Sequence, residues 1–414
     1  PPFPITFVSI RRRDPAALVA TAARTSRHGG QYEHDLASPR SSMSGYLLFS
    51  HDGFGLGHVR RNLLVARSIL AADPSADVTL VTGVATRPRW LDDPRIRVVQ
   101  VPPLLKNVGS GDYRCESMPT TEAITVRQRQ FRGLVERLDP QVIVVDRHPY
   151  GTAGELRAGL ELARDNGAVN VLGLRDVLDA PEVVATEMRG AGWAGVTDVF
   201  DEVLVYGSPT FVDHEAEYGL PVTPVYCGWV VESVESTRSE PGLLAVAAGG
   251  GGDGGEVFAL AAELVRRAPP WRAVVAAGCY TDDAALSDTR RLSGHRMAVE
   301  HDLDGCVDLF ARAAAVLCMA GYNSTVEALA AGQRPILFPR RSPRREQAIR
   351  AGRLASLGLA DVVDAGAPAS EVHWLLNQSR RTGPSRLKAA GIRLDGADVA
   401  ARQLLRLAQP RVAA

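Results

Sequence analysis

The sequence contains very little lysine and no long apolar run. Lys106 and Lys388 are its two lysines, so almost all of the 47 basic residues are arginines. They are balanced by 47 acidic residues, and this neutral total gives no support to nucleic-acid binding through bulk charge. Because no apolar run approaches the roughly 20 residues that span a bilayer, we expect no integral membrane segment.

Cysteine is also sparse, and its spacing excludes two kinds of site. The five cysteines are scattered, odd in number, and show no metal-ligand spacing. This usage predicts a reducing, cytoplasmic compartment without structural disulfides.

The order of apolar and amphipathic segments is typical of a parallel α/β architecture. A chain of 414 residues is too long for one ordinary core, so we expect two domains. Strand-like segments alternate with helix-like ones throughout. The expected strands of the first half are residues 45–50, 77–82, 96–100, 141–146, 169–173 and 202–206. Those of the second half are residues 243–248, 273–277, 315–319, 335–338 and 361–363.

Changes in composition predict the domain boundaries. Residues 1–43 carry Arg11-Arg-Arg13 but no apolar signal core, and we expect a disordered extension without function. An arginine-rich targeting or docking arm is the alternative. An N-terminal Rossmann-like domain (44–230), a polar linker (231–242), a C-terminal Rossmann-like domain (243–395) and a helix that crosses back (396–414) follow.

A glycine loop follows the first expected strand and opens the first helix: His51-Asp-Gly-Phe-Gly-Leu-Gly-His58. Its glycines, Gly55 and Gly57 among them, let the backbone turn sharply and approach a ligand closely. At the helix start the dipole disfavours imidazolium, so His58 stays neutral and able to accept a proton. We therefore regard His58, or its neighbour Asp52, as a candidate general base. A tight turn without a ligand is the alternative.

A second glycine loop, residues 249–255, lies between a strand and a helix of the second half. Such a loop is suited to hold an anion, and we expect Gly250, Gly251 and Gly252 to contact phosphate. A flexible linker is the alternative. Asp253 is awkward in this interpretation because a carboxylate repels a diphosphate.

The most informative segment runs from Val316 to Gln347. An apolar strand leads into a small polar turn at the start of a helix, where Gly321, Asn323, Ser324 and Thr325 could bind phosphate. One turn on, Glu327 could accept hydrogen bonds from two ribose hydroxyls. The string Ser324-Thr-Val-Glu327 also fits a capping box, with Ser324 as N-cap.

A cluster of arginines, then an acid and an amide, follows the next strand. We expect one or two of these arginines, Arg340 foremost, to face a diphosphate, and Glu346 and Gln347 to contact the hydroxyls of a hexose. The alternatives are a solvated patch and an exposed helix start.

Two aspartates, Asp146 and Asp176, end or follow apolar strands, so they should reach the same edge as the glycine loops. We expect them on the acceptor side, orienting an acceptor or assisting His58. A strand-end salt bridge is the alternative for each.

Taken together, these motifs resemble GT-B glycosyltransferases, most closely glycosyltransferase family 28, which includes the enzyme that completes lipid II. The resemblance covers most of the chain beyond residue 44. It implies two Rossmann-like domains and inverting transfer from a nucleotide sugar, UDP-linked, to an acceptor hydroxyl. The acceptor, whether metabolite, polysaccharide or lipid, is not readable from the sequence.

The resemblance also implies that no metal and no other cofactor takes part. The Asp-x-Asp pair typical of metal-dependent transferases occurs once, as Asp302-Leu-Asp304, ahead of a helix. Two other functions share the fold or the site: a nucleotide-sugar 2-epimerase, and a non-catalytic nucleotide-sugar-binding protein.

Overall fold

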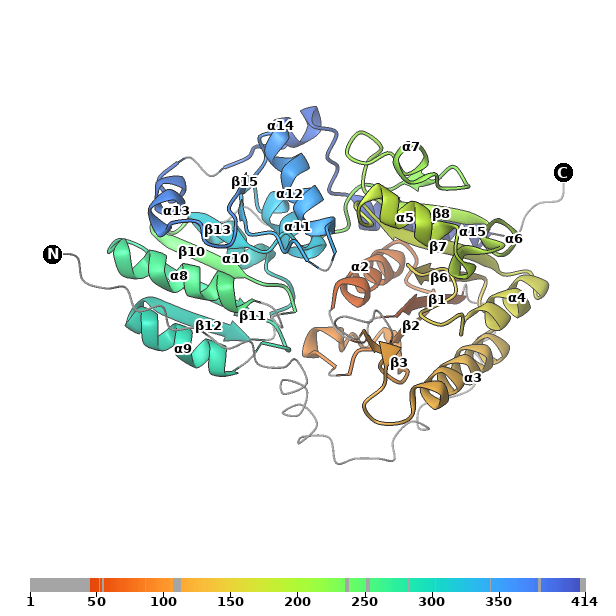
Figure 1. The fold of residues 1–414 in the computed structure, drawn as a ribbon. Coiled ribbons are helices and arrows are strands. Elements are labelled where there is room, and N and C mark those ends of the chain that lie inside the picture. Colours follow the sequence, from red (N-terminus) through yellow and green to blue (C-terminus); the bar gives the residue numbers. More distant parts are fainter. Residues whose placement is uncertain are drawn as a thin grey trace. The chain divides into compact units, whose positions relative to one another are not determined.

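The computed structural model describes residues 45–409, except for residues 52, 54, 55, 86, 107–112, 235–237, 251–253, 282, 302, 343, 379 and 380. The described residues all belong to one compact unit. Within it the strands gather into two parallel sheets, one of seven and one of six strands (Figure 1). The expected extension, residues 1–43, lies outside the described residues.

The seven-stranded sheet is built by the first half of the chain. Its strand order is β3-β2-β1-β6-β7-β8-β9, and its neighbours are parallel. The strands are β1 (Gly45–Ser50), β2 (Asp77–Thr82), β3 (Ile96–Gln100), β6 (Val142–Asp146), β7 (Val169–Arg175), β8 (Glu202–Tyr206) and β9 (Val225–Tyr226). A separate antiparallel pair is formed by β4 (Leu105–Lys106) and β5 (Tyr113–Arg114).

The six-stranded sheet is built by the second half, in the order β12-β11-β10-β13-β14-β15. Its strands are β10 (Leu243–Ala247), β11 (Arg272–Ala277), β12 (Met297–His301), β13 (Ala315–Cys318), β14 (Ile336–Leu337) and β15 (Asp361–Val362). The central strands of both sheets are almost entirely apolar and buried, as expected where helices cover both faces of a parallel sheet.

The helices alternate with these strands. Those of the N-terminal half are α2 (Gly57–Ala72), η1 (Arg89–Leu91), α3 (Thr120–Leu138), α4 (Arg157–Asp165), α5 (Pro181–Met188), η2 (Ala191–Trp193), α6 (Val196–Val199) and α7 (His214–Tyr218). Those of the C-terminal half are α8 (Gly255–Arg267), α9 (Asp283–Ser293), η3 (Gly294–Arg296), α10 (Val307–Arg312), α11 (Tyr322–Ala330), α12 (Glu346–Ser356), α13 (Ala369–Leu376) and α14 (Pro384–Ala389).

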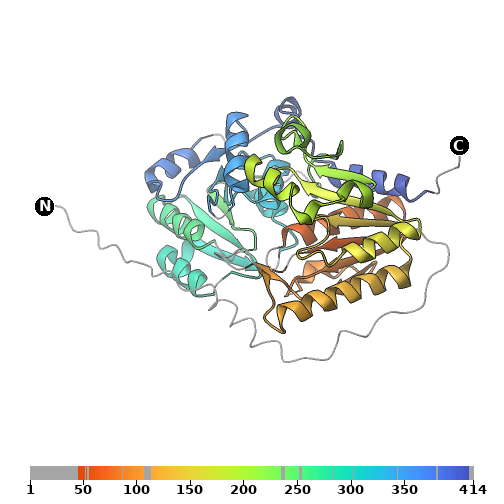
Figure 2. The same ribbon diagram turned by 45° about the vertical axis from the view of Figure 1, so that its right-hand side comes forward.

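The last helix, α15 (Gly396–Leu407), does not stay with the C-terminal half. It packs against α2, with Leu404, Ala400 and Ala401 buried. Figures 1 and 2 show α3 and α4 on the opposite face of the seven-stranded sheet. The helix that carries His58 is therefore supported from behind by the end of the chain.

Both sheets have the strand order of a doubly wound fold, which creates a switch point where the order reverses. In the first sheet this point lies between β1 and β6, and in the second between β10 and β13. Loops that leave adjacent strands in opposite directions open a crevice there, at the carboxyl edge of the sheet. The sequence motifs at His58, Gly250 and Gly321 all lie in loops or helix starts of these two places.

All eleven strands expected from the sequence are present, most within one or two residues of the expected ends. The sequence analysis missed β9, the hairpin strands β4 and β5, and β12. Strand β12 was missed because it is an edge strand. Its residues Ala298 to His301 are partly or fully exposed, so no apolar run marks it.

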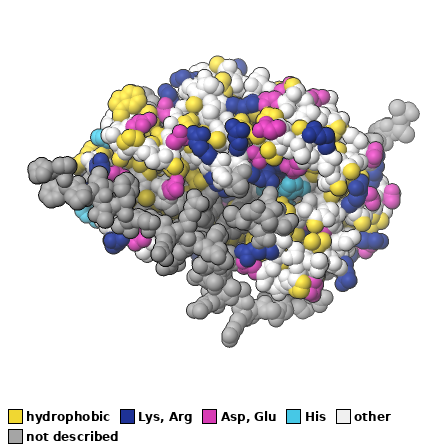
Figure 3. All heavy atoms as spheres, in the orientation of Figure 1, with side chains coloured by type: hydrophobic (Ala, Val, Ile, Leu, Met, Phe, Trp, Pro, Cys, Tyr) yellow, Lys and Arg dark blue, Asp and Glu magenta, His cyan; other side chains and the backbone are white. Residues whose placement is uncertain are grey.

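The surface described by the structure carries mixed charge. Arg and Asp or Glu side chains are interspersed over the face shown in Figure 3. Among the described residues, no helix has both the length and the apolar character required to cross a membrane.

The packing of α15 on α2 makes a stability prediction. Leu404 is fully buried in this contact, whereas Arg402, two residues before it, is exposed. We expect Leu404→Ala to lower the free energy of unfolding by about 2–5 kcal/mol because it leaves a cavity. Arg402→Ala should change it by less than about 0.5 kcal/mol. Urea titration followed by tryptophan fluorescence measures both; equal effects would contradict the docking of α15.

Candidate functional site

A cavity of about 370 Å³ lies where the carboxyl edges of the two sheets meet. This volume falls in the range of small-molecule sites in proteins. Both halves of the chain line it. From the predicted site residues, the cavity is lined by Gly57, His58, Gly250, Gly321, Asn323, Ser324, Glu327, Arg340, Glu346 and Gln347.

His58 and Asp146 lie close together on the N-terminal side. His58 begins α2, and Asp146 ends the neighbouring strand β6 with its side chain fully buried. His58 Nδ1 lies 3.0 Å from Asp146 Oδ1. In the tautomer with its hydrogen on Nδ1, the imidazole donates toward the carboxylate and keeps a lone pair on Nε2, because a carboxylate only accepts hydrogen bonds. His58 thereby has the arrangement of a general base held by a buried acid.

Arg61, one turn into α2, holds this aspartate in its ionised form. Its Nη2 donates to Asp146 Oδ2 at 2.5 Å and lies 3.1 Å from His58 Nδ1. Burial alone would raise the pKa of Asp146, but Arg61 and His58 together hold it below its usual value. The carboxylate is therefore charged at neutral pH and can stabilise an imidazolium at His58.

Two further histidines surround His58. The ring of His51 lies 4.4 Å from that of His58 and 5.0 Å from that of His148. Burial lowers the pKa of His51 well below its usual value and also lowers that of His148, although Glu187 opposes the second shift. The rings of His51 and His148 are therefore neutral. Of the three histidines, His58 is the one that lies beside a buried carboxylate, that of Asp146.

The start of α11 is the place of the predicted anion site on the C-terminal side. Gly321 is its N-cap, and neither a capping side chain nor an acidic residue occupies its first turn. Its amide groups and the positive end of its dipole are therefore available to an anion. Asn323 and Ser324 line the cavity there. Thr325 is buried and does not line the cavity.

The start of α11 also touches the start of α2. Asn323 Nδ2 donates to the carbonyl of Gly57 at 3.5 Å. Helix α2, too, lacks a capping side chain and a first-turn acid. Two uncapped helix starts, one from each half, thus border the same cavity.

The glycine loop after β10 is held by a second loop after β11. The amide of Tyr280 donates to the carbonyl of Gly250 at 3.0 Å. A Cβ at Gly278 would lie within 2.5 Å of Gly250 backbone atoms, so only glycine allows this approach. The two loops pack backbone on backbone beside the cavity.

Glu327 is buried at the cavity wall, and the capping box suggested for it is wrong. The helix begins at Tyr322, so Ser324 is not its N-cap. Glu327 Oε2 instead accepts a hydrogen bond from the amide of Cys306 at 3.0 Å. Burial raises the pKa of Glu327 to about 7, although the nearby Arg60 opposes this shift.

Glu346 and Gln347, at the start of α12, are both buried and line the cavity. Gln347 Oε1 accepts from the amide of Arg340 at 3.0 Å, and Arg340 Nη2 donates to Glu346 Oε1 at 3.1 Å. The alternative of an exposed helix start is therefore wrong for both residues.

Asp176 lies elsewhere than the cavity wall. Its carboxylate is buried and accepts two hydrogen bonds from Arg350, at 2.9 and 2.6 Å, and one from Trp229 at 3.1 Å. Both oxygens are occupied, so the salt-bridge alternative describes Asp176 better than a role toward an acceptor. Asp176 directly follows β7 in the N-terminal half, and Arg350 lies on α12 in the C-terminal half. The pair therefore joins the two halves.

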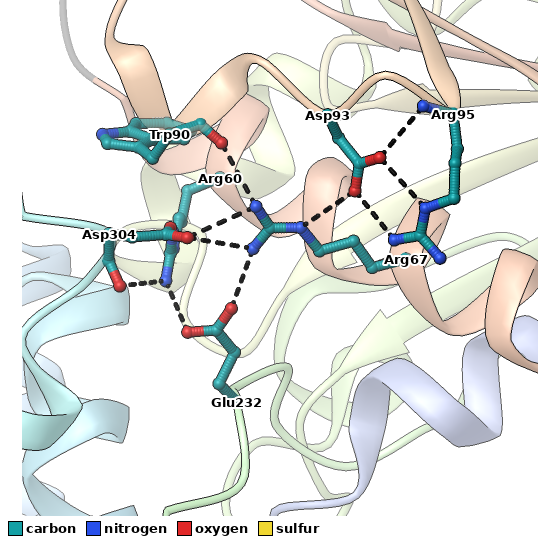
Figure 4. Close-up of polar contacts among 7 residues, drawn as sticks. All are labelled: Arg60, Arg67, Trp90, Asp93, Arg95, Glu232 and Asp304. Carbon is teal, nitrogen blue, oxygen red and sulfur yellow. Dashed lines mark hydrogen bonds and ion pairs between the residues drawn. The ribbon is translucent and has the colours of Figure 1, made fainter.

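A second set of contacts joins the halves at the other end of the cavity (Figure 4). Arg60 and Arg67, both on α2, donate to Asp304 before α10 and to Glu232. The guanidinium of Arg60 also lies over the ring of Trp90, 5.3 Å from its centroid. Asp304 of the Asp-x-Asp pair is thus bound to arginines, while Asp302 lies outside the described residues.

Several predicted residues are not described, and several observed ones were not predicted. Asp52, Gly55, Gly251 and Gly252 lie outside the described residues. The sequence analysis missed Arg60, Arg61, Trp90, Tyr322 and Arg350. In the described part of the chain, no group of three or more His, Cys, Asp or Glu side chains is arranged to hold a metal ion.

The raised pKa of Glu327 predicts a pH effect on stability. Between 4.5, its ordinary value, and about 7 the native state holds more protons on this group than the unfolded state. Its contribution to stability therefore falls as pH rises through that window. We expect the difference in free energy of unfolding, Glu327→Gln minus wild type, to rise by about 3 kcal/mol from pH 5 to pH 8. Glu371→Gln, at an exposed position on α13, should show a flat difference, and a flat line for Glu327→Gln would refute the assignment.

The sequence matches no protein-family model, and a search of curated proteins found no match. Solved structures do match. MurG of Acinetobacter baumannii superposes with a TM-score of 0.53 at 15% identity, covering 88% of this chain and 98% of its own. UGT71G1 of Medicago truncatula, complexed with UDP-glucose, gives 0.54 at 10% identity, covering 89% and 99%. A putative UDP-N-acetylglucosamine 2-epimerase from Listeria monocytogenes gives 0.57 at 12% identity, covering 88% and 96%. At such identities the likeness concerns the fold, and the chain has the GT-B fold.

Proposed function

We propose that this protein is a glycosyltransferase that moves a sugar from a UDP-sugar to an acceptor hydroxyl, with inversion and without a metal cofactor. One observation carries the proposal. A histidine held by a buried aspartate and an uncapped helix start with a buried glutamate border the same cavity, from opposite halves. The GT-B fold and the UDP-glucose complex of UGT71G1 support it.

In this proposal the donor binds to the C-terminal half. The amides at the start of α11 and in the loop at Gly250 take the diphosphate. Glu327 accepts from the ribose hydroxyls, and Glu346 and Gln347 contact the hydroxyls of the sugar. Arg340 adds positive charge beside Glu346.

The chemistry requires one proton transfer and one displacement. His58 Nε2 removes the proton of the acceptor hydroxyl, and the resulting imidazolium is stabilised by Asp146. The acceptor oxygen attacks the anomeric carbon as the bond to the diphosphate breaks on the opposite face. The negative charge that develops on the leaving nucleoside diphosphate is met by the α11 amides and by arginines. Because the base and the diphosphate site belong to different halves, attack and departure occur on opposite sides of the sugar.

Nucleotide binding tests the donor site directly. We expect calorimetry with UDP, TDP, GDP and ADP to show micromolar binding of UDP and weaker binding of the others. Glu327→Ala should weaken UDP binding about 10- to 100-fold, because hydrogen bonds to a charged acceptor are lost. Glu371→Ala, at an exposed position on α13, should match wild type. Binding of none of the four nucleotides would overturn the proposal.

The proposed base makes a kinetic prediction. His58→Ala and Asp146→Asn should lower the rate of UDP release from UDP-sugars, with candidate acceptors, by about 10²- to 10⁴-fold. Their UDP affinity should stay at the wild-type value, since neither residue belongs to the donor site. His295→Ala, at an exposed position, serves as the control. Unchanged turnover in both variants would show that His58 is not the base.

A 2-epimerase is the second candidate, favoured by the likeness to the Listeria protein. Incubation with a UDP-sugar and no acceptor separates the two. A transferase leaves the sugar configuration unchanged, whereas an epimerase produces the 2-epimer or free sugar. If neither reaction occurs although UDP binds, a non-catalytic nucleotide-sugar-binding protein is the remaining candidate.

A further inference from the structure

Arg175, the last residue of β7, lines the cavity with a guanidinium that has no carboxylate partner among the described residues. Its Nη2 donates to the carbonyl of Leu178 at 3.1 Å. Its Nε is buried without a hydrogen-bond partner, and no bond of Nη1 to a described residue is found. An arginine that is largely enclosed and lacks an ion pair is unusual, because guanidinium burial is costly without a counter-charge.

The neighbouring arginines do not share this condition. Arg147 Nη2 lies 2.8 Å from Glu187, and Arg350 Nη2 lies 2.6 Å from Asp176.

The arginines from the loop before α12 are also matched. Arg340 Nη2 lies 3.1 Å from Glu346, and Arg344 Nη1 lies 3.9 Å from Asp179. Each of these four arginines therefore pairs with a different carboxylate. The guanidinium of Arg175 is the fifth in this region, and it pairs with none of them.

The charges around Arg175 are mostly positive. Its pKa is lowered to about 10, chiefly by burial and also by Arg147, Arg350 and Arg344, while Glu346 opposes the shift. Glu346 attracts Arg175 without forming an ion pair with it: its Oε1 is bound to Arg340, and its Oε2 is buried without a hydrogen-bond partner. An anionic ligand group beside Arg175 would lie next to one unpaired guanidinium, with further arginines nearby.

We propose that Arg175 binds a carboxylate on the sugar that is transferred, so that the donor is a nucleotide-linked uronic acid. This inference rests on the proposed function. It places the carboxylate on the donor sugar because Arg175 lines the same cavity as Glu346 and Gln347, the residues proposed to hold that sugar. A guanidinium binds a carboxylate through charge-assisted hydrogen bonds, and the one hydrogen bond of Arg175 to a described residue is that of Nη2, which leaves Nη1 to donate.

UDP-glucuronate and UDP-glucose form a matched pair for the test, because they differ only in a carboxylate in place of a hydroxymethyl group. We expect calorimetry to show that wild type binds UDP-glucuronate at least about tenfold more tightly. In Arg175→Met this preference should fall to about onefold, with the affinity for UDP unchanged. Arg341→Met, which removes an exposed arginine of the same loop region as Arg340, should keep the preference.

The variant should fold, because Arg147 Nη1 also donates to the Leu178 carbonyl, at 3.0 Å, and keeps it satisfied. A melting temperature no lower than that of wild type would verify this. Equal affinity of wild type for the two sugars would overturn the inference and leave the proposed function standing. A loss of UDP affinity in Arg175→Met would overturn it too, since Arg175 would then bind the diphosphate. Failure of wild type to bind UDP would end both.

Discussion

The buried ion pair between Asp176 and Arg350 is the contact on which the rest of the site depends. Both side chains are about 1% exposed, and they come from different halves of the chain. Charges removed from water are stable only when their hydrogen-bonding capacity is filled. Here Trp229 and the amide of Val177 complete the shell of Asp176. The pair fixes α12 against the end of β7.

That fixation brings residues of different origin to one place. Helix α12 begins with Glu346 and Gln347, and β7 ends with Arg175, so the same ion pair positions the proposed sugar contacts of both halves. At the opposite end, Arg60 and Arg67 hold the loop at Asp304 against α2. His58 lies on α2, the helix that also carries Arg60 and Arg67, and its Nδ1 is 3.0 Å from Asp146 at the end of β6. The arrangement of these side chains thus depends on long-range contacts between elements.

The sequence predicted the parts of this arrangement that depend on local pattern. Apolar runs marked the buried strands, and glycine, serine and histidine after a strand marked the helix starts at His58 and Gly321. It did not predict the contacts that depend on pairing across the fold. Arg61 and Arg350 look like ordinary polar positions of a helix, and only the tertiary structure shows their buried aspartates. The capping box predicted at Ser324 is wrong for a related reason: Glu327 accepts a hydrogen bond from the amide of Cys306, which is 21 residues away in the sequence.

The return of α15 to the N-terminal half constrains how such a protein can be recombined. The segment before it is also tied there, since the amide of Trp229 donates to the carbonyl of Arg393 and that of Gly396 to the carbonyl of Trp229. A C-terminal half from a relative cannot be joined at a single crossover, because the chain passes through that half and comes back. A functional chimera needs two junctions, and it must retain the native helix α15, which packs against α2, at its C-terminus.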